Sequence, residues 1–245
     1  MDPAGIGASV EGFHAVAAAL DARRVLKLTV ESGRLRRPLY EQLIERAEEA
    51  GVVVELVDDV RPEAVTDAPQ GVVAEATPIA PTSLEAAVAL IDPPGLLVLD
   101  HIEDPRNVGA VARTAVAAGV PALVVARRRS APLGPTAFKA AAGALERIAV
   151  VEVSSLPEAL KRLGGLGVWC LGLDGSAERS ILGHHLLTEP VALVIGAEGG
   201  GLSRLVAERC DELVRLPMAG DVESLNASVA AGLAVYELSR MRSWV

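Results

Sequence analysis

From Leu96 onward, short apolar runs alternate with longer segments whose apolar residues recur at helical spacing. The runs predict strands at Leu96–Leu99, Ala122–Val125, Ile148–Val151, Val168–Leu171, Val191–Ile195 and Leu213–Leu216. Helices are predicted at Asn107–Ala118, Thr136–Ala142, Leu156–Leu163, Leu202–Cys210 and from about Ser224 to Arg240. Short, wholly apolar strands that alternate with helices are typical of a parallel sheet with both faces covered. The sequence therefore predicts an α/β fold here.

The first part of the chain predicts a smaller α/β unit. Helical spacing appears at Val10–Leu20 and Pro38–Ala50, and strands are predicted at Val25–Val30, Val52–Val57 and Gly71–Ala76. The stretch from Thr77 to Ser83 holds two prolines in seven positions, as linkers do. We therefore expect a small domain at 1–76, a linker at 77–83 and a larger domain at 84–245.

Composition limits the classes of protein that this chain can represent. With 245 residues and 51% apolar residues it can bury a substantial core, and a net charge of −9 predicts no strong non-specific binding to nucleic acid. The two cysteines predict no disulfide framework, with Cys170 as a buried strand residue. We find no apolar run long enough for a membrane span and no signal peptide, so we expect a cytoplasmic protein without a membrane partner.

Common ligand-binding signatures are absent. A dinucleotide fold requires G-x-G-x-x-G directly after a strand, and neither Gly5–Gly7 nor Gly165–Gly167 meets that requirement. This makes a nicotinamide-dependent dehydrogenase a poor interpretation. None of the four histidines pairs with cysteine or carboxylate at zinc-ligand spacing, and His184-His185 is interpreted as part of a polar loop. We expect no metal site.

Three polar segments each follow a predicted strand and lead into a predicted helix. The first contains Asn107, Gly109 and Arg113, with Gly109 one helical turn before Arg113. The second places Glu198 among four glycines. The third gathers Ser224, Asn226 and Ser228, more polar side chains than one helix cap requires. Because ligands of open α/β sheets bind at the carboxyl ends of the strands, these segments predict one site.

The three segments together resemble the SpoU/TrmH family of RNA ribose 2′-O-methyltransferases, in the SPOUT superfamily. The matches are N-x-G-x-x-x-R at 107–113, G-A-E-G-x-G-L at 196–202 and P-M-x-G-x-x-x-S-L-N-x-S-V-A at 217–230, in this order. Further resemblance lies at 12–16, 70–74 and from Arg129 to Ala144, so nearly the whole chain is covered. Within the family, the chain is most similar to bacterial enzymes that methylate a guanosine of 23S rRNA.

The resemblance implies a fold and a cofactor that periodicity does not reveal. The family's parallel sheet ends in a deep trefoil knot, an exception to the rule that chains avoid knots. S-adenosylmethionine binds bent in that knot, and the enzymes are homodimers whose sites are completed across the interface. The first domain resembles the L30e-like RNA-binding domain of these relatives. By resemblance, the cofactor-binding residues are Gly172, Leu173, Ile195, Gly196, Gly199, Leu216, Met218, Ser224 and Leu225.

The resemblance also implies catalytic residues, namely Arg113, Asn107, Glu198, Ser224 and Asn226. A ribose 2′-OH must lose its proton as it attacks the methyl group, and the family assigns activation of that hydroxyl to the residue matching Arg113. Because the pKa of a free guanidinium is about 12.5 or higher, Arg113 is a poor base unless its site perturbs it strongly. The chemistry of a guanidinium fits two other roles better than that of a base. It can stabilise the developing alkoxide and bind the adjacent phosphate.

Two arginine clusters are candidate RNA-binding residues in an otherwise acidic chain. Arg127, Arg128 and Arg129 follow the strand next to the first polar segment, whereas Arg34, Arg36 and Arg37 lie in the first domain, whose net charge is about −6 on a count of its residues. The function hypothesis is methylation of a guanosine in 23S rRNA. The alternatives are the same chemistry on tRNA or on an antibiotic-resistance site of rRNA, and a non-catalytic RNA-binding or ribosome-assembly factor.

Overall fold

The computed structural model describes residues 5–220 and 224–243, which form two compact units. The first comprises the residues up to Ala80 together with Pro132–Glu146, and the second comprises Pro81–Ala131 and the residues from Arg147 onward. The boundary at Ala80 lies inside the predicted linker at 77–83. The return of Pro132–Glu146 to the first unit differs from the predicted continuous domain at 84–245.

The first unit is built on a four-stranded sheet in the order β1 (Ser9–Glu11), β4 (Val72–Ala76), β2 (Val25–Glu31) and β3 (Val53–Val57). Only β2 and β3 run parallel. Helices α1 (Phe13–Asp21) and α2 (Pro38–Glu49) belong to it. Val10 and Glu11, predicted as helix, lie in β1 because Gly12, with φ of +86°, turns the chain before α1 begins.

The segment Pro132–Glu146 joins the first unit through packing and charge. It contains α5 (Pro135–Ala141), and the buried ring of Phe138 on this helix lies directly under Gly7. A Cβ at Gly7 would stand 2.3 Å from Cζ of that ring, so only glycine allows the contact. Glu146 forms an ion pair with Arg24, in which Arg24 Nε donates to Glu146 Oε2 over 2.7 Å. Sequence periodicity carries no sign of such long-range packing.

The second unit is a seven-stranded sheet whose strand pairs are all parallel, as predicted. Its order is β7 (Ala149–Val153), β6 (Ala122–Ala126), β5 (Gly95–Leu99), β10 (Val191–Ile195), β8 (Trp169–Leu173), β11 (Glu212–Arg215) and β9 (Arg179–Ser180). The two-residue strand β9 is too short to leave a sequence pattern. Strand β10 enters the sheet between β5 and β8, both of which precede it in the chain.

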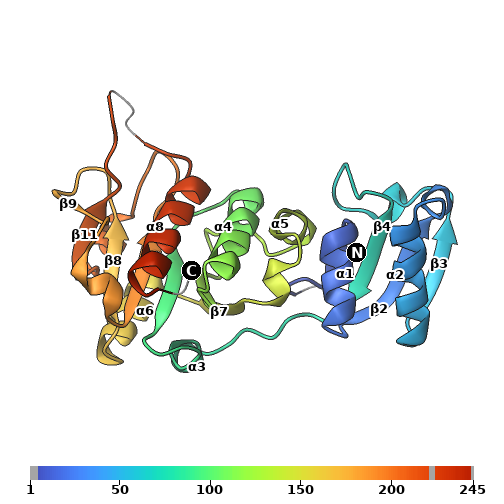
Figure 1. The fold of residues 1–245 in the computed structure, drawn as a ribbon, viewed down its shortest axis with the longest axis horizontal. Helices are drawn as coiled ribbons and strands as arrows, with labels where there is room; N and C mark the ends of the chain where they lie inside the picture. The colour runs from blue at the N-terminus through green and yellow to red at the C-terminus, as the bar shows by residue number, and fades with distance from the viewer. Residues whose placement is uncertain (1–4, 221–223, 244–245) are drawn as a thin grey trace. The chain divides into compact units, whose positions relative to one another are not determined.

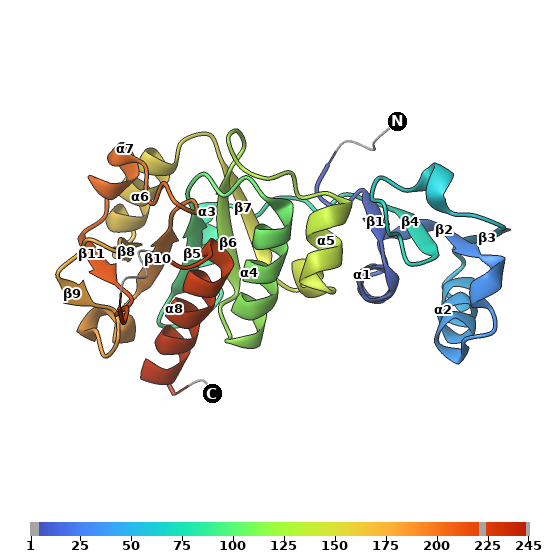
Figure 2. The same ribbon diagram turned by 90° about the horizontal axis from the view of Figure 1, so that it is seen from above.

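Helices cover both faces of this sheet (Figures 1 and 2). Helices α4 (Pro105–Ala117) and α8 (Ala227–Met241) lie side by side on one face. Helices α3 (Leu84–Val88), α6 (Leu156–Gly165) and α7 (Arg204–Ala207) pack on the other. The helix α7 is shorter than the predicted helix Leu202–Cys210. Helix α4 begins as predicted, because Asp104 Oδ1 accepts the Arg106 N–H over 2.8 Å and Pro105 follows.

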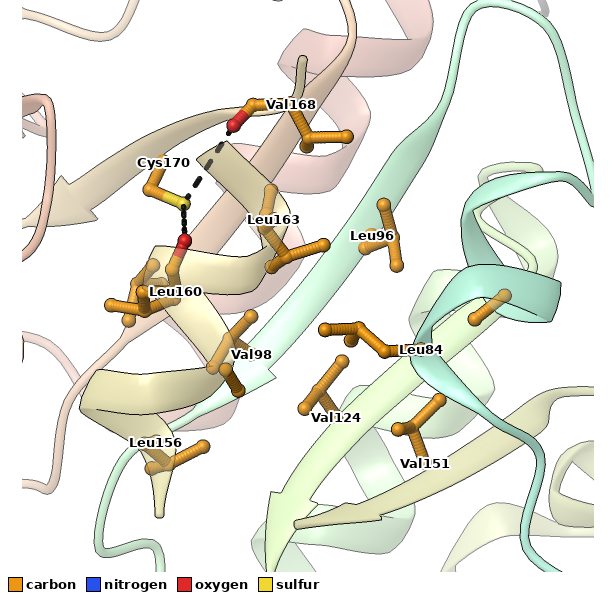
Figure 3. Close-up of a cluster of buried hydrophobic side chains, with 14 of the residues drawn as sticks. Leu84, Leu96, Val98, Val124, Val151, Leu156, Leu160, Leu163, Val168 and Cys170 are labelled. Atoms are coloured by element: carbon orange, nitrogen blue, oxygen red, sulfur yellow. Dashed lines mark hydrogen bonds between the residues drawn. The ribbon is translucent and has the colours of Figure 1, made fainter. Parts of the chain in front are cut away.

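Alternating side chains of the strands form the core (Figure 3). Leu96, Val98 and Val124 pack against Leu160 and Leu163 of α6, whereas the intervening Leu97 and Leu99 are equally buried on the opposite face. Cys170 is buried as predicted, in the same cluster as Leu96 and Leu160. Burial raises the pKa of its thiol to about 12. Both faces of the sheet therefore bury apolar side chains. Polar functional side chains are then expected at the ends of the strands.

Among the described residues, no helix is long and apolar enough to cross a membrane.

The segment with His184 and His185 was interpreted as a polar loop, but the structure buries His184. Its Nδ1 accepts the Leu186 N–H over 3.4 Å, and its Nε2 lies 3.3 Å from Glu212 Oε1. This imidazole has a structural role in the turn before β10.

Candidate active site

The three polar segments follow the carboxyl ends of β5, β10 and β11, at one edge of the second unit's sheet. A cavity of about 320 Å³ opens there, within the usual size range of small-molecule sites. Its lining comprises Leu173–Gly175 after β8, Ile195–Leu202 from β10 onward, Leu216 and Met218 after β11, and Ser224, Leu225, Ala227 and Ala230. Asp221–Glu223, in the middle of the third segment, lie outside the described residues.

Eight of the nine residues predicted to bind the cofactor line this cavity, and Gly172 does not. A Cβ at Gly172 would lie 2.7 Å from Leu202 Cδ1, 2.7 Å from Leu213 Cδ2 and 2.9 Å from Cys210 Sγ. Gly172 is therefore required for close packing between β8 and the chain around it. Its place at the edge of the cofactor site stays a prediction, because Gly172 is buried and only the adjacent Leu173 lines the cavity.

The glycine-rich segment after β10 forms a tight turn that supplies one wall of the cavity. The Ala197 N–H donates to Gly201 O over 3.0 Å, and the Gly201 N–H donates back to Ala197 O over 2.9 Å. A Cβ at Gly196 would lie 2.2 Å from Gly201 C, so any side chain there would push the two arms apart. Gly199 and Gly201 have φ of +73° and +62°, which side chains rarely adopt. The wall is thus largely backbone.

Asn226 connects the three segments through hydrogen bonds. Its Nδ2 donates to Asn107 Oδ1 over 3.2 Å and to Glu198 Oε2 over 3.1 Å. Its Oδ1 accepts the Ser228 N–H over 2.9 Å and the Ser228 hydroxyl over 2.6 Å. The amide orientation is fixed by these contacts, since the oxygen faces the donors and the nitrogen faces the acceptors.

Asn226, and not Ser224, caps helix α8. The predicted helix start at about Ser224 was therefore three residues too early, since α8 begins at Ala227. Ser224 is exposed at the rim of the cavity and belongs to the extended segment before the helix. The sequence predicted that the polar residues of this segment do more than cap the helix. Asn226 does so, because it caps α8 and also contacts the two other polar segments.

Arg113 is not brought into this network. It lies on α4, is exposed and does not line the cavity, and it forms no hydrogen bond or ion pair with any residue that the structure describes. Gly109, one turn earlier on α4, is buried. Of the five predicted catalytic residues, Asn107, Glu198 and Asn226 are thus in mutual contact, Ser224 is at the cavity rim and Arg113 is free for another partner.

The candidate RNA-binding arginines differ in their surroundings. Arg127, Arg128 and Arg129 are all exposed after β6, at the same sheet edge as the cavity. Their segment is held beside the loop after β5, because the Ala131 N–H donates to Ile102 O over 2.9 Å. In the first unit, Arg36 and Arg37 are exposed, but Arg34 Nε donates to Glu31 Oε2 over 3.2 Å.

Sequence reasoning missed Asp174, Gly175, Ala227 and Ala230 as lining residues. Asp174 and Gly175 directly follow β8, so extending the strand-end rule to every strand of the sheet would have found them. Ala227 and Ala230 are the small residues of the first turn of α8 and carried no separate signal. Within the described ranges, no group of three or more metal-ligating side chains occurs.

Known proteins are similar to this chain over most of its length. Residues 94–236 match the model of the SpoU rRNA methylase family, and residues 9–82 match that of the RNA 2′-O ribose methyltransferase substrate-binding domain. The chain is 42% identical over 240 residues to the 23S rRNA (guanosine-2′-O-)-methyltransferase RlmB of Ralstonia nicotianae, with 96% of each chain covered. The corresponding RlmB of Photorhabdus laumondii is 40% identical, covering 96% of this chain and 98% of its own.

Solved structures agree with these sequence matches. The SpoU methyltransferase AviRb from Streptomyces viridochromogenes, in complex with the cofactor AdoMet, is similar with a TM-score of 0.80. It is 26% identical, and the alignment covers 97% of this chain and 91% of that one. The sequence matches and the fold thus agree, and the chain belongs to the SpoU rRNA methylase family.

Proposed function

We propose that this protein transfers a methyl group from S-adenosylmethionine to the ribose 2′-OH of a guanosine in 23S rRNA. The observation that carries the proposal is the backbone-walled cavity joined to the Asn107–Asn226–Glu198 network. It occurs in a chain that matches RlmB enzymes along 96% of its length. The same family membership argues against a dehydrogenase, and the intact network argues against a non-catalytic assembly factor.

The cavity fits S-adenosylmethionine by size and by the kind of groups that line it. Leu173, Leu202, Leu216 and Leu225 offer apolar surface, and the turn at Gly196–Gly201 offers backbone N–H and C=O groups. When bound, the cofactor supplies an electrophilic methyl group on a sulfonium sulfur. Side chains at Gly199 or Gly200 would project into open space, so these positions allow a ligand to approach the backbone. We assign Ile195, Gly196, Gly199, Met218 and Ser224 to the same cofactor site.

The polar network orients the reacting groups. Asn226 fixes Glu198 and Asn107 relative to one another. We propose that the ribose approaches the cavity beside them. Methyl transfer depends on in-line positioning, which such a network provides without covalent catalysis. Ser224, at the rim, is placed to contact the ribose or the cofactor.

Arg113 supplies the positive charge that the developing alkoxide requires. Because it lies outside the cavity of its own chain and forms no hydrogen bond or ion pair with the described residues, its charge is available to an approaching RNA phosphate. We propose that it stabilises the alkoxide and grips the adjacent phosphate. No metal takes part in this mechanism.

A homodimer would complete such a site. Helix α8 exposes an apolar stripe of Val229, Leu233 and Tyr236, which are 49%, 49% and 46% exposed. Their spacing of four and three residues places them on one side of the helix. Since α8 lies next to α4, a second copy packed on this stripe comes close to Arg113. The expectation of a homodimer comes from the family resemblance, and its placement on this stripe is part of our proposal.

The RNA is proposed to lie along the sheet edge, over Arg127, Arg128 and Arg129. The first unit, matched by the substrate-binding domain model, is proposed to select the target through an L30e-like fold with Arg34, Arg36 and Arg37. Pairing of Arg34 with Glu31 reduces the positive charge that this cluster offers to RNA.

We also propose that the second unit contains the trefoil knot. The insertion of β10 between β5 and β8, both of which precede it in the chain, is compatible with such a knot. Since we propose a 23S rRNA substrate, we also propose that the enzyme acts in the cytoplasm.

The substrate assignment is tested by incubating the purified protein with radiolabelled S-adenosylmethionine and separated, unmodified 23S rRNA and tRNA. We expect label in 23S rRNA at a single alkali-resistant ribose on a guanosine. Label in tRNA alone, or at another rRNA base, would keep the chemistry and replace the target with one of the alternatives. Binding of neither cofactor nor RNA would overturn the proposed function.

Replacing Arg113 by alanine tests its role. We expect kcat to fall by about 10²–10³-fold, the usual cost of removing one group that stabilises a developing oxyanion. Affinity for S-adenosylmethionine, measured by calorimetry, should stay within about twofold, because Arg113 does not line the cavity. Methyl transfer at the wild-type rate in this variant would remove Arg113 from the mechanism.

Replacing Leu233 by glutamate tests the dimer. A charge in the centre of the apolar stripe should prevent its burial, so the mass in solution should fall from twice 25.4 kDa to a single chain. Leu205→Glu on α7 is the matched control, since Leu205 is also exposed, at 54%, but lies outside the stripe. Equal masses for the two variants and the wild-type protein by light scattering would exclude this helix as the interface.

The double substitution Arg127→Gln/Arg128→Gln tests the RNA surface. We expect weaker binding of a 23S rRNA fragment and a salt dependence whose slope drops by about one for each arginine that contacts a phosphate. The control is Arg162→Gln/Arg179→Gln, which also removes two charges, but from side chains already paired with Glu85 and Glu212. Identical affinities and slopes for both double variants in fluorescence anisotropy titrations would place the RNA elsewhere.

A further inference from the structure

Asp100 is a completely buried carboxylate that the proposed mechanism does not use. It is the residue that directly follows β5, beside the strand β10 that leads into the glycine-rich turn. Burying a carboxylate is unfavourable unless it is satisfied by hydrogen bonds. Its contacts therefore indicate what the charge is retained for.

The contacts of Asp100 reach both ends of the glycine-rich segment. Its backbone N–H donates to Ile195 O over 2.8 Å, immediately before Gly196. Its Oδ2 accepts the Ser203 N–H over 2.6 Å, immediately after Leu202. One residue thus holds the chain where it enters and where it leaves the cavity wall.

The wall has few other means of keeping its shape. The Ala197–Gly201 backbone bonds close the turn, and Glu198 reaches Asn226 at its tip. A Cβ at Gly199, Gly200 or Gly201 would meet nothing within 4 Å, so no side-chain packing holds these positions. The exit of the turn, with the cavity-lining Leu202, depends on Ser203 and hence on Asp100.

His101 fixes the direction of the Asp100 carboxylate. Its Nδ1 lies 2.5 Å from Asp100 Oδ1, and since a carboxylate oxygen accepts, Nδ1 is the donor. With Oδ1 occupied by the imidazole, Oδ2 is left for Ser203. The backbone of His101 has φ of +57°, a conformation uncommon for a residue with a side chain. His101 also begins the loop that leads to Asn107.

We propose that Asp100 is a positioning residue, oriented by His101, whose carboxylate holds the glycine-rich turn in the form that binds S-adenosylmethionine. The proposal rests on the proposed function for the identity of the ligand. A purely structural role would lower the stability of the unit without a specific effect on the turn. A positioning role changes cofactor affinity and the protection of the Ser203 amide together.

The test compares Asp100→Ala, Asp100→Asn and His101→Ala with Asp211→Asn. The last variant is the matched control, because Asp211 Oδ2 also accepts a backbone N–H of this sheet, that of Cys170, over 2.7 Å, away from the turn. Two readouts are measured, the Kd for S-adenosylmethionine by calorimetry and the hydrogen exchange of the Ser203 amide in the ligand-free protein.

We expect Asp100→Ala to raise the Kd by about tenfold or more and to speed exchange at Ser203, the expected scale for losing a buried acceptor. Asp100→Asn should recover part of the loss, because an amide oxygen still accepts from Ser203. His101→Ala should raise the Kd by a smaller factor, and the Asp211→Asn variant should stay within about twofold of the wild-type protein.

If Asp100→Ala does not fold, the two milder variants decide the question. A Kd within twofold of the wild-type value and unchanged Ser203 exchange in both would overturn the proposal, as would an equal effect in Asp211→Asn. Failure of the wild-type protein to bind S-adenosylmethionine would instead count against the proposed function. Exchange at Ser203 in the ligand-free variants would still test whether Asp100 holds the turn.

Discussion

The close approach of Gly196 to Gly201 is the constraint on which the site depends. No Cβ fits between these two backbones, so the chain can fold back on itself there and form a wall of peptide groups. A cofactor site walled by backbone, as we propose here, does not require a dinucleotide fingerprint. It also leaves the turn without a side-chain core of its own. Its shape must then be set by neighbours, and Asp100 and Asn226 provide the contacts at its base and at its tip.

The sequence predicted the second unit's sheet well because its strands are buried on both faces. A continuous apolar run such as Val191–Ile195 is a strong signal, and β10 has these same bounds. Strand β1, with Val10 and Glu11, was missed because three residues carry too little pattern, and β9 is shorter still. Segment 132–146 was assigned to the wrong unit, since its link to the first unit depends on Phe138 under Gly7 and on the Arg24–Glu146 pair.

At the site, the motif resemblance predicted which residues lie at the cavity more accurately than it predicted what each of them does. Gly172 and Gly196 both looked like cofactor contacts, but the missing Cβ serves strand packing at Gly172 and the closed turn at Gly196. The last helix was expected to start at about Ser224, whereas Asn226 is its cap and also joins two other segments. Sequence alone cannot separate such roles, because they depend on which neighbours, distant in the chain, surround each residue.

The charge distribution follows from the same arrangement. The chain carries a net charge of −9, yet the sheet edge beside the cavity keeps Arg127, Arg128 and Arg129 exposed. Several other arginines of the second unit are neutralised locally, as Arg162 is by Glu85 and Arg179 by Glu212. The proposed RNA surface would then retain a local attraction for phosphate at this edge, although the protein as a whole is acidic.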